Sequence, residues 1–76
     1  GKLSDYEKKK ISNVLNCFID GISQQQKAIE KLVEFLTILQ TSAGNTKLQP
    51  IIDHLNQLNP LLSNLLNRLS ALNTAV

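Results

Sequence analysis

The chain of 76 residues is long enough for one small domain, and its net charge of +2 is too small to indicate a polyanionic partner. The single cysteine, Cys17, excludes an internal disulfide, and the single histidine, His54, has no second residue at metal-ligand spacing. A domain of this size buries only about 60% of the surface that its unfolded chain exposes. Association with a second copy or with another protein is therefore the expected source of further stability.

The first predicted helix begins at Ser4. Ser4 and Glu7 have the spacing of a capping box, in which each side chain accepts a hydrogen bond from the other residue's backbone N–H. Apolar residues then recur at alternating steps of four and three residues over four heptads, which is the pattern of a coiled coil. The seam positions in this pattern are Ile11, Leu15, Phe18, Ile22, Gln25, Ile29, Leu32, Leu36 and Leu39. Gln25 is the polar exception, and it either fixes the register of the seam or lies exposed without effect.

The pair Asp20 and Gly21 weakens the middle of this helix, and Ser23 with Gln26 could cap a second one. The heptad phase nevertheless continues across Gly21, which favours one helix over about residues 4–41, with two helices meeting at residues 20–23 as the alternative. A polar loop over residues 42–46 follows, in which Gly44 suits a left-handed helix cap. A loop this short makes the next helix an antiparallel neighbour.

The second predicted helix covers about residues 47–74. Its seam positions are Leu48, Ile51, Leu55, Leu58, Leu62, Leu65, Leu69, Leu72 and Val76, all of them apolar. Pro50 falls in the first turn, where a missing N–H does no harm. Pro60 falls inside the helix at a position away from the seam, which predicts a kink, with a true break after Asn59 as the alternative.

These patterns predict an all-α fold, a long antiparallel helical hairpin resembling a coiled coil. Further apolar residues widen the stripe on each helix, namely Val14, Ile19, Ala28, Val33, Phe35, Ile52, Leu61 and Leu66. Two helices cannot cover so wide a stripe, so we expect association to complete a four-helix bundle. The second helix carries little charge besides Asp53 and Arg68, which is typical of a helix packed inside an assembly. The alternative is a compact monomeric bundle of three or four helices, with breaks near Gly21 and Pro60.

The expected function is a non-enzymatic protein–protein interaction or assembly module, whose partner is a second copy or another helical protein. The residues expected to carry it are Leu55, Leu58, Leu61, Leu62, Leu65, Leu66, Leu69, Leu72, Phe18, Ile22, Ile29, Leu32, Leu36 and Leu39. We find no set of residues that would make a catalytic, cofactor or metal site.

Two alternatives remain, and the sequence argues against both. Lys8, Lys9 and Lys10 form a basic run that could bind nucleic acid, although acidic neighbours favour a solvated helix face. The second helix could lie on a membrane surface, although its polar face has one basic residue, Arg68. No signal peptide or membrane-spanning segment is recognised, and a lone cysteine favours an intracellular compartment.

Overall fold

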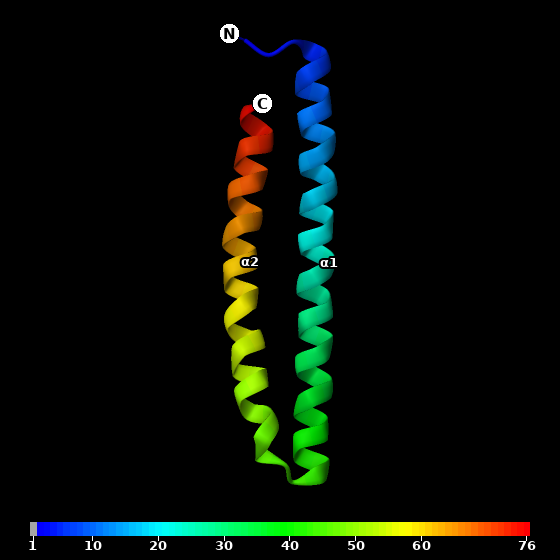
Figure 1. Ribbon diagram of the computed structural model, residues 1–76, viewed down its shortest axis with the longest axis vertical. Helices are drawn as coiled ribbons and strands as arrows, with labels where there is room; N and C mark the ends of the chain where they lie inside the picture. The colour runs from blue at the N-terminus through cyan, green and yellow to red at the C-terminus, as the bar shows by residue number, and fades with distance from the viewer. Residues whose placement is uncertain (1) are drawn as a thin grey trace.

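The computed structural model describes residues 2–76 and is an antiparallel hairpin of two long α-helices (Figure 1). Helix α1 spans Asp5–Ala43, a single 3-10 turn η1 spans Thr46–Leu48, and helix α2 spans Gln49–Ala75. The helices lie side by side along their length, and both chain ends lie at the end away from the turn (Figure 1). The molecule measures 60 × 15 × 13 Å, so it is one layer of two helices. The predicted all-α helical hairpin is confirmed.

Both ends of α1 form as the sequence predicts. The Ser4 N–H donates to Glu7 Oε1 at 3.0 Å, and the Glu7 N–H donates to Ser4 Oγ at 3.1 Å, which completes the capping box. At the other end Gly44 has a φ of 62°, in the left-handed region, and its N–H donates to the Gln40 carbonyl. Glycine adopts this conformation without the steric cost that a Cβ brings. The Asn45 side chain then caps η1 by accepting from the Lys47 N–H at 2.9 Å.

Neither weak point of the sequence interrupts a helix. Helix α1 continues through Gly21, and α2 continues through Pro60. Pro50 lies in the first turn of α2, where the first backbone N–H groups of a helix have no partner within it. The chain therefore folds back once, at residues 44–48, and the compact bundle with breaks at Gly21 and Pro60 is not observed.

The core between the two helices is small. Only Ile22, Ile29 and Ile52 are buried among the described residues. Half-buried side chains continue the seam above and below them, namely Leu15, Ile19, Val33 and Leu36 of α1 and Leu55, Leu62, Leu66 and Leu69 of α2. A seam this thin leaves most of the apolar surface of the hairpin in contact with solvent.

Of the 18 predicted seam positions, 11 are buried or half-buried and 7 are exposed. The row containing Leu15, Ile22 and Leu36 does face α2, but Phe18, Leu32 and Leu39 are exposed. In α2, Leu55, Leu62 and Leu69 face α1, whereas Ile51, Leu65 and Leu72 are exposed. The places of the exposed residues are taken by Ile19, Gln26, Val33 and Gln40 of α1 and by Ile52, Asn59, Leu66 and Asn73 of α2. Both helices are thus rotated about their axes relative to the prediction.

Candidate protein-interaction face

The rotation of the helices gives the hairpin two different faces. Successive residues of a helix are turned by about 100° around its axis. Phe18 therefore lies to one side of the seam residue Ile19, and Ser23 lies to the other side of Ile22. The same holds for Leu65 before Leu66 and for Ser63 after Leu62. Because the helices are antiparallel, Phe18 and Leu65 share one face of the hairpin, and Ser23 and Ser63 share the other.

The polar face is joined by hydrogen bonds between uncharged side chains. Near the chain ends, Ser12 Oγ donates to Asn73 Oδ1 at 2.8 Å, and Asn73 Nδ2 donates to Asn16 Oδ1 at 2.8 Å. Near the turn, Gln40 Nε2 donates to Gln49 Oε1 at 2.7 Å. These bonds fix the side of each helix that faces its neighbour.

Gln26 makes the central contact of the polar face. Its Nε2 donates to Ser63 Oγ at 2.7 Å and to the Asn59 carbonyl at 3.2 Å. Among the described residues, the buried Gln40 Oε1 and Asn59 Oδ1 have no hydrogen-bond partner. A buried polar atom without a partner costs stability, so the polar face determines the register of the hairpin more than it strengthens it.

Sequence reasoning missed these amides because they interrupt the apolar stripe. A signal was nevertheless present in the sequence. In both helices every second residue of this row is an amide, as in Ile19, Gln26, Val33 and Gln40 of α1 and Ile52, Asn59, Leu66 and Asn73 of α2. Matching amides at a spacing of two heptads indicate a row in which polar side chains pair between helices.

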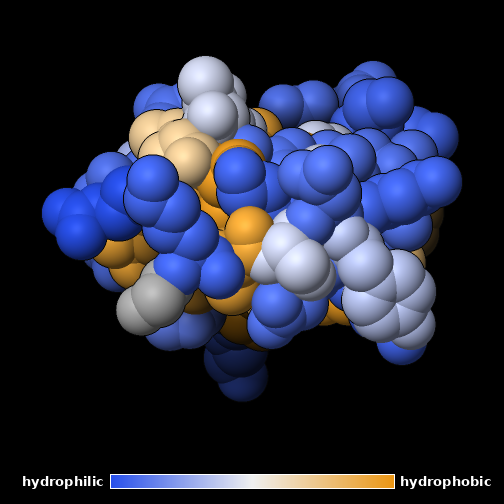
Figure 2. Space-filling model, turned by 90° about the horizontal axis from the view of Figure 1, so that it is seen from above, coloured by the Kyte–Doolittle hydropathy of each residue, from blue (hydrophilic) through white to orange (hydrophobic). Residues whose placement is uncertain are grey.

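The apolar face lies on the opposite side of the hairpin. We define it by Val14, Phe18, Gly21, Gln25, Ala28, Leu32, Phe35 and Leu39 of α1 and by Ile51, Leu58, Leu61, Leu65 and Leu72 of α2. Several of its side chains are mostly exposed, with 68% of Val14, 57% of Phe18 and 65% of Leu61 accessible to solvent. Seen along the long axis from the end with the chain termini, hydrophobic surface reaches the outside between hydrophilic side chains (Figure 2).

A groove of about 490 Å³ opens on the apolar face. Its lining is almost wholly apolar and consists of Val14, Cys17, Phe18, Gly21, Ile22, Gln25 and Leu62. The space beside Gly21 is empty, since a Cβ at that position would meet no atom within 4 Å. Gln25, the polar exception in the predicted seam, lies exposed at the edge of the groove. The groove is thus a recess in the uncovered apolar surface, in the half of the hairpin nearer the chain ends.

The predicted interaction residues divide between the seam and the apolar face. Those at the seam are Ile22, Ile29, Leu36, Leu55, Leu62, Leu66 and Leu69. Those on the apolar face are Phe18, Leu32, Leu39, Leu58, Leu61, Leu65 and Leu72. The first group packs between the two helices, although Ile22 and Leu62 also line the groove. The second group is exposed except for Leu58, which is half-buried.

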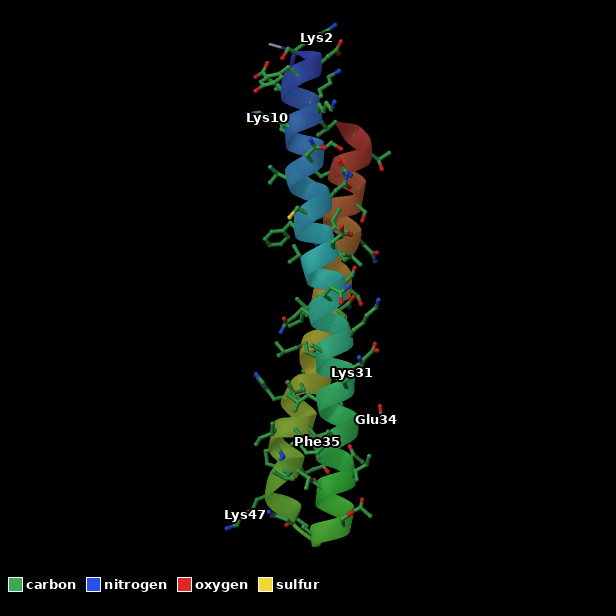
Figure 3. All side chains as sticks on the ribbon, turned by 90° about the vertical axis from the view of Figure 1, so that its right-hand side faces the viewer. Lys2, Lys10, Lys31, Glu34, Phe35 and Lys47 are labelled. Carbon is green, nitrogen blue, oxygen red and sulfur yellow. The ribbon has the colours of Figure 1, made fainter. Side chains whose placement is uncertain are left out.

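Charged side chains are spread along the molecule. Lys2 and Lys10 lie toward the end with the chain termini, and Lys47 lies at the turn (Figure 3). Lys8, Lys9 and Lys10 are all exposed on α1, and Lys10 Nζ lies 5.1 Å from the centre of the Tyr6 ring, a cation–π contact. Cys17 is an exposed free thiol.

Within residues 2–76, no group of three or more His, Cys, Asp or Glu side chains is placed to hold a metal ion. Neither α1 nor α2 has an apolar stretch of the length and hydropathy needed to cross a membrane.

The comparisons with known proteins add no functional information. No protein-family model, curated protein or solved structure matches the chain. The candidate site is therefore defined by its physical chemistry, that is, by an apolar face with one open groove.

Proposed function

We propose that the protein is a non-enzymatic protein–protein interaction module, and that its binding surface is the apolar face. The observation that carries this proposal is the exposure of large apolar side chains along both helices beside a core of three buried residues. Contiguous apolar patches of this kind on proteins generally mark sites where another molecule binds. The partner surface should be helical, because rows of side chains spaced three and four residues apart interdigitate with the ridges of another helix.

The weakness of the hairpin itself supports the same proposal. Burial of apolar surface is the main source of folding free energy, and here few side chains are removed from water. Two buried amide oxygens, on Gln40 and Asn59, also lack partners among the described residues. A partner that covers the apolar face would add the missing burial, so that binding and stability would rise together.

Site-specific photocrosslinking tests this proposal. A photoreactive amino acid would replace Leu61 on the apolar face or, as a matched control, the exposed Asn56 on the other side of α2. In the cells that naturally make the chain, irradiation should yield protein adducts from position 61 and few or none from position 56. Equal adducts from both positions, or none from position 61, would show that the apolar face is not a protein-binding surface.

A further inference from the structure

We infer that the occupant of the apolar face is a second copy of this chain, and that two hairpins stack face to face with their turns at the same end. In this arrangement the two-fold axis runs parallel to the helices, and α1 of each copy packs on α2 of the other. This inference rests on the proposed function and names the partner.

The area of the exposed surface fits a dimer interface. The solvent-accessible surface of the hairpin is 5843 Å². A compact monomer of 8.4 kDa would expose about 4,600 Å², which leaves an excess of about 1,200 Å². A stable interface removes about 800 Å² from each partner, so the excess surface of the hairpin is enough to form one.

The register of the hairpin makes the apolar face complementary to itself. A two-fold axis parallel to the helices keeps both copies at the same height, so α1 meets those α2 residues that lie level with it in its own chain. Asn73 bonds both Ser12 and Asn16, which places Val14 level with Asn73 and within one residue of Leu72. Gln26 bonds both Asn59 and Ser63, which places Gln26 level with Leu61. Counting along the helices between these contacts brings Gly21 within one residue of the level of Leu65.

At these levels small residues of α1 face large residues of α2. Gly21, which lines the groove, meets Leu65 of the second copy, and Ala28 meets Leu58 in the same way. The smaller Val14 meets Leu72. Alternation of small and large side chains across an interface allows two helices to interdigitate at the density of a protein core. Because these levels come from the hairpin itself, the match requires no sliding of one copy along the other.

Charge presents no obstacle to this stacking. Arg68 lies within one residue of the level of Phe18, and its Nε donates to Asn64 Oδ1 on its own helix at 3.4 Å. A guanidinium group on the face of a phenyl ring is a favourable contact, which accommodates the charge at the interface. The net charge of +2 per chain adds little repulsion between copies.

Sedimentation equilibrium over a concentration series measures the association directly. We expect the apparent mass of the full chain to approach twice 8.4 kDa as the protein concentration rises. Leu61→Lys and Val14→Lys each place a charge on the apolar face and should each raise the dissociation constant at least about tenfold, the size of effect that loss of a well-packed interface residue has. Both side chains are mostly exposed in the single hairpin, so these variants should keep its helical circular dichroism. The matched controls Asn56→Lys and Asn13→Lys add the same charge at exposed positions off the apolar face and should leave the dissociation constant unchanged.

Either of two results would overturn the second-copy inference. The first is a helical monomer at every concentration, and the second is a dimer that both apolar-face variants and their controls weaken equally. If position 61 still crosslinks to a protein of another mass, the interaction function stands and only the identity of its partner is wrong.

Spin labels at the turn test the arrangement of the two copies. Ser42→Cys, in a Cys17→Ala background, places one label per chain at an exposed position in the last turn of α1. With the turns at the same end the labels should lie within about 30 Å, because neighbouring helix axes are about 10 Å apart. A separation on the order of 50 Å, the length of a long helix at 1.5 Å per residue, would place the turns at opposite ends and overturn the arrangement.

Discussion

Glu7 is the residue whose ionisation is most directly tied to helix formation. The Ser4 backbone N–H bonds its carboxylate, the Ser4 side chain adds to this, and together they lower the pKa of Glu7 below its ordinary value of 4.5. A carboxyl group whose pKa falls on folding stabilises the folded state above its unfolded pKa. That stabilisation is lost as the pH falls through the folded pKa.

We therefore expect the start of α1 to be insensitive to pH near neutrality and to fray as the pH falls below about 4.5. The amide proton of Glu7, which donates to Ser4 Oγ, reports this fraying by NMR exchange. Glu7→Gln is the matched control, because it keeps an acceptor oxygen but does not titrate. If acid increases the exchange of this amide equally in both proteins, the ionisation of Glu7 is not the cause of the fraying.

At the scale of a helix, the two prolines of α2 have different surroundings. Pro60 lies in the interior of the helix, where it cannot donate to the carbonyl of residue 56. Pro50 lies in the first turn, where no intrahelical bond is missing. One helix thus contains both a costly proline and a harmless one.

Pro60→Ala should increase the free energy of unfolding by about 2 kcal/mol, since the restored helix bond outweighs the added freedom of the unfolded chain. Pro50→Ala, the internal control, should change it by less than about 0.5 kcal/mol. Urea unfolding followed by circular dichroism, at one protein concentration, measures both. Equal changes in the free energy of unfolding for the two variants would mean that the position of a proline in the helix does not determine how much it destabilises the protein.

The helices and their ends were predictable because their sequence signals are local. The rotation of each helix about its axis was not predictable. The capping box at Ser4 and the glycine cap at Gly44 each lie within one helical turn, and the uninterrupted heptad phase indicated that α1 passes through Gly21. The choice between Phe18 and Ile19 at the seam depends instead on α2. Both residues continue an apolar row, and the bonds that decide between the rows join residues 33 to 61 positions apart, such as Gln26 with the Asn59 carbonyl and Ser12 with Asn73.

That rotation also determined how much of the site was predictable. Leucines on the apolar face, such as Leu61 and Leu65, were identified as interaction residues from their apolar spacing alone. Phe35, by contrast, was recognised only as a flanking residue, and the groove at Gly21 was not predicted. A cavity depends on which side of the helix the glycine faces, and a heptad count in one helix does not contain that information.

At the scale of the whole molecule, the hairpin is held together almost without charge. The side-chain bonds between its helices join amides and hydroxyl groups, as in Gln26 with Ser63 and Asn73 with Asn16. The rest of the seam is apolar. Salt therefore has few favourable ionic contacts to screen.

We expect the thermal midpoint to change little between about 0.05 and about 0.5 M sodium chloride, where the screening length falls well below the size of the molecule. Sodium sulfate at equal ionic strength should raise the midpoint, because sulfate strengthens the burial of apolar surface. Thermal scans at one protein concentration compare the two salts. A midpoint that falls steadily as chloride is added would show that ion pairs contribute more than these contacts indicate.

The single turn also has a consequence for the order in which the chain folds. The Gln40–Gln49 bond closes a segment of 9 residues, whereas the Ser12–Asn73 bond closes one of 61. Because the entropy lost on closing a loop grows with its length, the helices should zip together from the turn toward the chain ends. Backbone amides near Ser12 and Asn73 should then open first in the native protein and exchange fastest. The groove beside Gly21 lies in the half that closes last, so its formation and its covering by a partner belong to the same late step.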